Sequence, residues 1–132
     1  MRVWASTLFG VVAFSLALAG TKSGGDPSPC YGKALFIEPM SEDFGQYITT
    51  EMMNQQVRLN VTTDASRAGC IMRGTAALGG FRNTGSASLQ LVGPGGDVIW
   101  SATSGDKDSV KDLGHNLVKQ LKHDLQTSPR AK

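Results

Sequence analysis

The side chains best suited to acid–base or metal chemistry are two histidines near the end of the chain, His115 and His123. Both lie in a segment whose leucine spacing predicts a helix, where eight residues span about 12 Å along the axis. That separation is too long for the two rings to share a metal ion, and the sequence has no Cys/His cluster to complete a site. We therefore interpret both as solvated helix residues, which also argues against Ser-His-Asp or Cys-His catalysis.

Three carboxylates, Glu38, Glu42 and Asp43, cluster where a predicted strand ends and a predicted helix begins. A pair of them could act as general acid and base, but acidic residues at the positive end of a helix dipole already have a structural role. The 16 glycines form no G-x-G-x-x-G or P-loop pattern, and no serine lies in a G-x-S-x-G elbow. The sequence thus predicts a protein without catalytic activity, bound metal or cofactor.

The chain has two cysteines, Cys30 and Cys70. An even cysteine count in an exported chain predicts a disulfide, and the alternative is two buried free thiols. Both cysteines lie at the starting ends of predicted strands. If those strands are parallel neighbours, the two Cα atoms fall within about 6 Å, the usual disulfide distance. The bond would close a loop of about 40 residues, worth roughly 3–4 kcal/mol in the chain-entropy model.

The first residues have the features of a cleavable secretory signal peptide. Arg2 supplies the positive start, residues 8–18 form an apolar run, and Ala17 and Ala19 give the small-x-small pattern that signal peptidase recognises. A membrane anchor needs roughly 20 uninterrupted apolar residues, and a lipoprotein needs a cysteine where Gly20 stands. We expect residues 1–19 to be removed, leaving an exported chain, periplasmic or extracellular, with no integral membrane segment.

Composition after the signal peptide is typical of one small domain. The chain has 13 basic and 11 acidic residues, and one of the basic residues lies in the signal peptide. Such a balanced charge gives no field toward nucleic acid or an anionic membrane, so we expect no nucleic-acid partner. We predict a flexible Gly/Ser/Pro linker at residues 20–29, a single domain at 30–126 and a disordered tail at 127–132.

The first half of the domain reads as strand, helix, strand. Residues 33–39 form a continuous apolar run that Pro39 ends, typical of a strand buried on both faces. Ser41 is a natural N-cap for a helix through residue 56. In that helix one apolar stripe repeats at helical spacing, and residues 57–63 alternate as in a second strand. The stripe consists of Phe44, Tyr47, Ile48 and Met52.

The second half predicts three strands and a final helix. The strands are residues 70–78, 86–92 and 97–103, and the last two should form an antiparallel hairpin. In residues 86–92, Ala87, Leu89 and Leu91 should share one face, and in the next strand Val98, Trp100 and Ala102 should do the same. Ser109 and Asp112 resemble a capping pair ahead of the final helix. The apolar side of that helix should contain Val110, Leu113, Leu117, Leu121 and Leu125.

Opposite these leucines lies a basic stripe made of Lys111, His115, Lys119 and Lys122. Such a stripe is usually a solvated helix face. The alternative is that it is a docking surface for an acidic partner, which makes these four residues the candidate partner surface of the chain.

The predicted element order is β-α-β-β-β-β-α, and it indicates an α+β fold. The early β-α-β and β-turn-β connections favour parallel pairing around the first strand, and the later hairpins are antiparallel. We therefore expect a mixed five-stranded sheet with the two helices packed on one face.

Five short motifs at residues 34–40, 59–64, 68–74, 87–92 and 96–101 carry a family resemblance. The set resembles small exported bacterial envelope proteins, whose fold is similar to the amino-terminal domain of the translocation protein TolB. It is also similar to that of the curli-secretion and lipopolysaccharide-assembly lipoproteins. The chain has Gly69, Cys70 and Ile71 where that family has Ala-Asp before an aromatic residue, and it has no lipobox. The resemblance implies a fold and an envelope setting, and no catalytic residue.

Three functions were weighed on these observations. The favoured hypothesis is a non-enzymatic exported domain that binds another envelope component by strand addition or helix docking. The second is a small-molecule or lipid binder with an apolar cleft between helix and sheet, lined by Met52, Met53 and Met72. The least favoured is a hydrolase in which His115 meets a nucleophile in a pocket.

Overall fold

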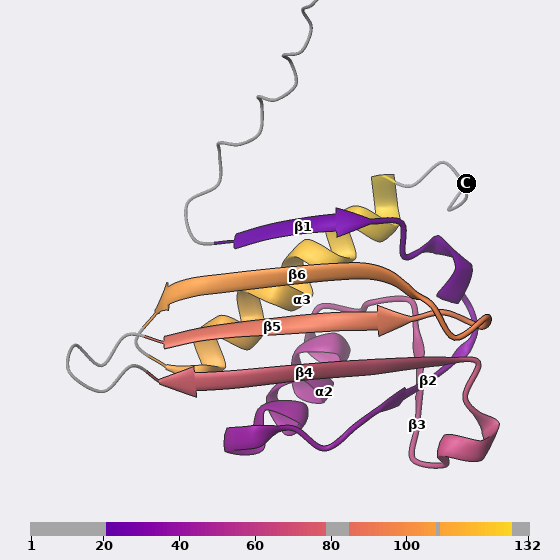
Figure 1. Cartoon of the computed structure of the whole chain (residues 1–132), viewed down its shortest axis with the longest axis horizontal. Helices are drawn as coiled ribbons and strands as arrows, with labels where there is room; N and C mark the ends of the chain where they lie inside the picture. Colours follow the sequence, from indigo (N-terminus) through magenta and orange to yellow (C-terminus); the bar gives the residue numbers. More distant parts are fainter. Residues whose placement is uncertain (1–20, 79–84, 108, 128–132) are drawn as a thin grey trace, which may run out of the picture.

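The computed structural model describes residues 21–78, 85–107 and 109–127, so the predicted signal peptide and the tail from residue 128 onward lie outside the described residues. In these ranges the chain has the predicted α+β fold, with one mixed sheet of six strands instead of five and two α-helices (Figure 1). Three short 3-10 helices join them: η2 (Ser28–Cys30), η3 (Ser41–Asp43) and η4 (Ala65–Arg67). The strands are β1 (Thr21–Gly25), β2 (Ala34–Ile37), β3 (Asn60–Thr62), β4 (Cys70–Leu78), β5 (Gly85–Val92) and β6 (Val98–Lys107); the helices are α2 (Phe44–Asn54) and α3 (Val110–Thr127).

The sheet has the spatial order β1-β6-β5-β4-β2-β3. β2 lies parallel to both β3 and β4, whereas the pairs β4–β5, β5–β6 and β6–β1 are antiparallel. The predicted parallel pairing of the strands that follow Cys30 and begin at Cys70 is therefore confirmed as β2 beside β4, with Leu35 opposite Cys70. The predicted hairpin is confirmed as the antiparallel pair β5 and β6.

Side chains of β5 alternate between the two faces of the sheet, as in any strand. Ala87, Leu89 and Leu91 are buried, as predicted, and Ser86 and Gln90 are exposed on the opposite face. This alternation gives the sheet one apolar face, which packs against the helices, and one polar face.

β6 follows the same pattern except at its start. Trp100 and Ala102 are buried, but Val98 is 51% exposed, which corrects the prediction that all three share one face. The cause is an irregularity in pairing: Leu91 opposes Trp100, while the next residue, Val92, opposes Val98. The extra residue on β6 shifts the alternation by one position.

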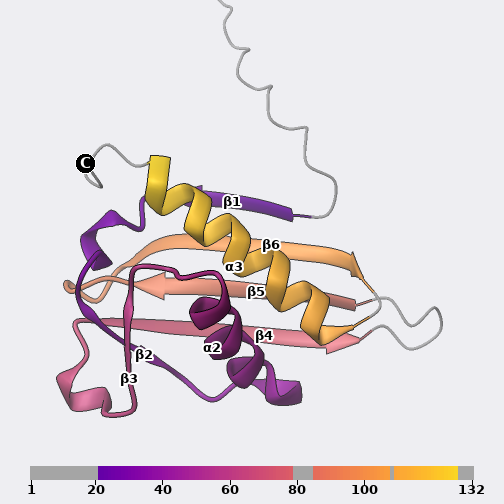
Figure 2. The same ribbon diagram turned by 180° about the vertical axis from the view of Figure 1, so that it is seen from behind.

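Both helices cover the same face of the sheet and lie side by side on it (Figure 2), as predicted. In α2, Phe44, Ile48 and Met52 are buried, whereas Tyr47 is 39% exposed and so lies at the margin of the predicted stripe. The predicted apolar side of α3 is buried along its whole length, at Val110, Leu113, Leu117, Leu121 and Leu125.

The capping prediction is confirmed for α3 and wrong for α2. The Ser109 hydroxyl accepts a hydrogen bond from the Asp112 backbone N–H at 3.1 Å. Ser41, by contrast, is the first residue of η3, and its hydroxyl donates to the Ala76 carbonyl of β4 at 2.9 Å. Ser41 therefore fastens the segment ahead of α2 to the sheet, and α2 begins after Asp43, whose side chain makes no capping bond.

Residues 21–25, predicted to belong to a flexible linker, form the edge strand β1, which pairs antiparallel with β6 from Thr21–Ser104 to Gly25–Trp100. The glycines that suggested a linker permit this pairing, because a Cβ on Gly25 would collide with the Ile99 carbonyl oxygen. The Thr21 and Ser104 hydroxyls also lie 3.0 Å apart. The ordered domain thus begins earlier than predicted.

Thr127, which was predicted to begin a disordered tail, is instead the last residue of α3. Among the described residues, no helix combines the length and apolar character needed to cross a membrane.

Candidate functional site

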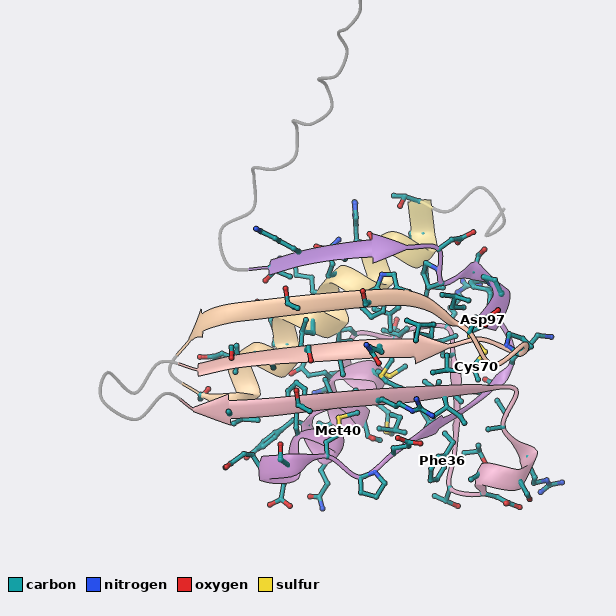
Figure 3. The ribbon with its side chains drawn as sticks, viewed as in Figure 1. Phe36, Met40, Cys70 and Asp97 are labelled. Carbon is teal, nitrogen blue, oxygen red and sulfur yellow. A yellow bond between two sulfur atoms is a disulfide. The ribbon has the colours of Figure 1, made fainter. Side chains whose placement is uncertain are left out.

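Cys30 and Cys70 form a disulfide, as predicted, with Cα atoms 6.0 Å apart. Cys30 ends η2 and Cys70 begins β4, where it is labelled in Figure 3. Both side chains are buried. The bond joins positions 40 residues apart and holds the segment that leads into β2 against the start of β4.

The four residues of the candidate partner surface do not form one uniform stripe. Lys111, His115 and Lys119 are exposed on α3, and Lys122 is half-buried. His115 contacts a carboxylate of α2, whereas Lys122 lines a pocket together with residues from two other segments. The predicted stripe therefore has two different parts: His115 is hydrogen-bonded to another helix of the domain, whereas Lys122 faces a pocket.

The carboxylate that His115 contacts is Glu51, a buried residue of α2 that the sequence analysis did not single out. His115 Nδ1 lies 3.0 Å from Glu51 Oε1, and Gln55 Nε2 donates to the same oxygen at 2.8 Å. Because an ionised carboxylate can only accept, the Nδ1 atom carries the hydrogen. Gln55 Nε2 also donates to the His115 backbone carbonyl at 3.2 Å, so the cluster links α2 to α3.

This environment changes the acidity of Glu51. Burial by itself raises the pKa of the carboxyl group. The hydrogen bonds from Gln55 and His115, together with the charges of His115 and Lys111, outweigh burial and hold the pKa below its ordinary value. The ionised form is therefore the one that the fold stabilises.

A second carboxylate, Asp124, joins α3 to the edge of the sheet. One of its oxygens accepts from the Trp100 indole N–H at 2.8 Å and from the Ser23 hydroxyl at 2.7 Å. The other accepts from Gln120 Nε2 at 3.0 Å. These contacts bring β1, β6 and α3 together, and they explain how a buried tryptophan satisfies its polar atom.

The three carboxylates predicted to cluster at residues 38–43 are an ion-paired residue and two exposed residues. Glu38 pairs with Arg73 of β4 at 3.3 Å, with both side chains partly exposed, and Glu42 and Asp43 are exposed in η3. His123 is also exposed. Within the described ranges, no three His, Cys, Asp or Glu side chains are grouped so that they could hold a metal ion.

An open groove of about 650 Å³ lies between α2 and the strands β2 and β3. Its apolar lining includes Phe36, Ile37, Pro39, Met40 and Val61. In Figure 3 the labelled Phe36 and Met40 lie on the side of β4 that faces away from β5.

This groove corrects the predicted cleft lining. Met52 and Met72 are core residues that contribute nothing to the groove, and Met53 is 72% exposed outside it. Met40 is the methionine of the groove, and the loop after β2 places it there.

A smaller pocket of about 230 Å³ lies where three segments meet: the residues after η2, the residues after α2 and the last turns of α3. Its lining is basic and amide-rich, and only Lys122 belongs to the predicted partner surface. The lining residues are Tyr31, Gln56, Arg58, Lys122, Leu125 and Gln126.

The face of the sheet opposite the helices has a third, shallow hollow of about 570 Å³. Short hydroxyl side chains from β4, β5 and β6 line it, including Thr75, Ser86, Ser88 and Thr103. The Thr75 and Ser88 hydroxyls lie 3.2 Å apart across two strands. Apart from Lys22 of β1, the lining consists of glycine, alanine and short hydroxyl residues, so this part of the face is a broad surface of small side chains.

Comparisons with known proteins show similarity in structure only. No protein-family model and no curated protein sequence matches the chain. A PelC dodecamer from Paraburkholderia phytofirmans matches with a TM-score of 0.56 and 13% identity, over 80% of this chain and 96% of that one. A second PelC dodecamer structure from this organism matches with a TM-score of 0.58 and 11% identity, over 83% and 99% of the two chains.

A DUF4136 family protein from Bacteroides thetaiotaomicron also matches, with a TM-score of 0.51 and 11% identity, over 85% of this chain and 96% of that one. Identities this low establish the fold alone. The finer resemblance to the TolB domain and to the lipopolysaccharide-assembly lipoproteins stays a prediction. The chain thus shares its fold with PelC and with a DUF4136 family protein, over nearly the whole length of each.

Proposed function

We propose that the chain is an exported, non-enzymatic domain of the bacterial cell envelope that binds another envelope component. The predicted signal peptide at residues 1–19 supports export. The Cys30–Cys70 disulfide is compatible with it, because such bonds persist in oxidising compartments. The domain then works in the periplasm or outside the cell.

The observation that carries the binding function is the helix-free face of the sheet. Both helices cover one face, which leaves the opposite face as a broad surface of short side chains such as Ser86, Ser88 and Thr103. Short side chains let another molecule approach the strands closely, and hydroxyl groups can both donate and accept hydrogen bonds. PelC, which shares this fold, is a dodecamer, and we infer that a further copy of this chain is the first component bound here.

Export is tested by expressing the full chain in a bacterium and measuring the intact mass of the protein from each cell fraction. We expect a periplasmic or extracellular species that begins at Gly20 and has no thiol that reacts with an alkylating agent. An uncleaved cytoplasmic chain with two reactive thiols would contradict the proposal.

Self-assembly is tested by placing a photo-crosslinking amino acid at Ser88, on the helix-free face, and at Lys119, on exposed α3, as the matched control. We expect cross-linked multimers from position 88 and native mass spectra with several copies per particle. Three results would exclude this surface as the interface: equal cross-linking at both positions, no cross-linking at either position, or a monomer in the native mass spectra.

The groove beside α2 favours a second function, binding of an apolar small molecule or lipid. It is open and its lining includes Phe36, Ile37 and Val61. Val61→Asp should abolish uptake of a fluorescent fatty acid, whereas Val98→Asp, at an exposed valine outside the groove, should not. Equal uptake of the fatty acid by both variants would contradict this second proposal.

A further inference from the structure

The small pocket beside the end of α3 has a lining whose charge is all of one sign. Arg58 follows α2 and Lys122 comes from α3, and no carboxylate side chain is part of the lining. Among the described residues, the ion pairs are Arg73–Glu38 and His115–Glu51, so neither cation of the pocket has an acidic partner there. The pocket therefore presents positive charge that the fold leaves unneutralised.

The remaining polar groups of the pocket are donors of the kind that bind oxyanions. The Tyr31 hydroxyl accepts from Arg58 Nη1 at 3.4 Å, which orients the guanidinium group and leaves its other N–H groups available. The side-chain amides of Gln56 and Gln126 add N–H donors. Leu125, 3% exposed, supplies the apolar part of the lining.

The backbone holds these groups in place before any ligand arrives. Tyr31 directly follows Cys30 of the disulfide, and its N–H donates to the Ser28 carbonyl at 3.0 Å. On the other side, the Val57 N–H donates to the Met52 carbonyl at 3.0 Å and closes the end of α2. The backbone segments that carry the pocket are therefore ordered without a ligand, and the freedom lost on binding is that of the exposed side chains.

Gln56 has an unusual backbone conformation for a residue other than glycine. Its φ is 58°, the left-handed conformation that commonly ends a helix and that favours glycine. A glycine would adopt this backbone without strain, yet the chain has an amide side chain that lines the pocket. Glu42 and Asp43, ahead of α2, also have positive φ values, so the conformation alone identifies no site; at Gln56 it coincides with the lining of the pocket.

From these observations we propose that the pocket binds an oxyanion, a phosphate or carboxylate group of an anionic envelope molecule, through Arg58, Lys122 and Gln56. The volume of about 230 Å³ fits one such group with a short part of the molecule attached to it. This inference is independent of the helix-free face, which lies on the other side of the sheet.

The competing explanation is structural. The carbonyl ends of α2 and α3 both lie near this pocket, and cations there could simply offset the negative ends of the helix dipoles. In that case Arg58→Gln and Lys122→Gln would lower stability and anions would not bind. The two explanations therefore predict opposite results in binding and in stability.

The test is a titration of the oxidised, isotope-labelled protein with inorganic phosphate, and separately with acetate, at constant ionic strength, followed by NMR. We expect saturable shifts of the amides of residues 31, 56, 58 and 122. Arg58→Gln and Lys122→Gln should each weaken binding at least tenfold, and the exposed controls Arg67→Gln and Lys33→Gln, outside the pocket and the candidate partner surface, should leave it unchanged. Saturation by only one of the two ions identifies a phosphate or a carboxylate as the group recognised.

Gln56→Gly makes the test sharper because it relieves the left-handed strain while it removes the amide. We expect a variant at least as stable as the parent that binds the anion several-fold more weakly. The proposal is overturned if neither ion gives saturable shifts, if the control variants weaken binding as much as the pocket variants, or if Gln56→Gly binds as tightly as the parent.

Discussion

Helix α3 borders two polar clusters that differ in one respect. At the Glu51–His115 cluster, a buried carboxylate meets an imidazole and an amide, so the charged group is satisfied within the chain. At the pocket near the end of the same helix, Arg58 and Lys122 have no carboxylate partner among the described residues. The difference indicates that the first cluster joins α2 to α3, whereas the second contains two positive charges that could bind an anion, as proposed above.

The largest loss of stability should come from removing the disulfide. This bond holds Tyr31 at the pocket and makes no contact with the Glu51 cluster. The double variant Cys30→Ser, Cys70→Ser should lose roughly 3–4 kcal/mol of unfolding free energy, since the bond constrains a long loop of the unfolded chain. Urea denaturation of the oxidised parent and the variant measures this. A variant as stable as the parent would show that the disulfide contributes nothing to the fold.

A smaller effect should follow from breaking the satisfied cluster. Glu51→Ala leaves Gln55 and His115 without their acceptor and should cost about 1–2 kcal/mol of unfolding free energy. Glu42→Ala, at an exposed carboxylate of η3, is the control and should stay within about 0.5 kcal/mol of the parent. Equal stabilities of the two variants would mean that the Glu51 contacts do not hold the helices together.

The same cluster should give the protein an acid-sensitive component. The folded state holds the Glu51 pKa below the unfolded value of 4.5, so the folded chain binds fewer protons and stability rises with pH in this range. The contribution is complete above about pH 4.5 and is lost as the pH falls through the lowered pKa. Melting temperatures between acid and neutral pH should fall less steeply in Glu51→Gln, and parallel curves would contradict this.

The smallest effect is expected at the pocket. Arg58→Gln and Lys122→Gln should each change the unfolding free energy by less than about 0.5 kcal/mol, because neither cation is paired within the described residues. Thermal melts at low and high salt measure this. A loss as large as that of Glu51→Ala would end the distinction between the two clusters.

Most of the fold could be predicted from the sequence because the elements packed on the core have clear periodicity. The leucines of α3, the alternation of β5 and the parallel pair of β2 and β4 follow from residue pattern and connection rules. The disulfide followed from those rules, since both cysteines begin segments that meet in the sheet.

Strand β1 could not be predicted, because residues 21–25 have no apolar pattern and their glycines are typical of a linker. The strand exists because β6 offers a free edge and because Ser23 reaches Asp124 of α3 at 2.7 Å. The exposure of Val98 was missed for a related reason, since a shift in pairing depends on the partner strand and leaves no mark in a single segment.

Only the α3 residues of the two polar clusters could be predicted from the sequence. His115 and Lys122 were predicted as charged residues of one helix face, but Glu51, which contacts His115, and Arg58, which lines the same pocket as Lys122, lie far away in the chain. The left-handed conformation of Gln56, where a glycine is usual, could not be predicted from the sequence. From the sequence alone, that position read as the end of the predicted helix.

The pairing of β1 with β6 also has a consequence for the order of folding. Translation makes Thr21 early, yet Ser104, which it contacts, follows 83 residues later. A contact this distant costs more loop entropy than the hairpins of the sheet do, so it is expected to form after them. The beginning of the domain, although synthesised before the hairpins, is thus expected to join the sheet after them, and until then β6 has an unpaired edge.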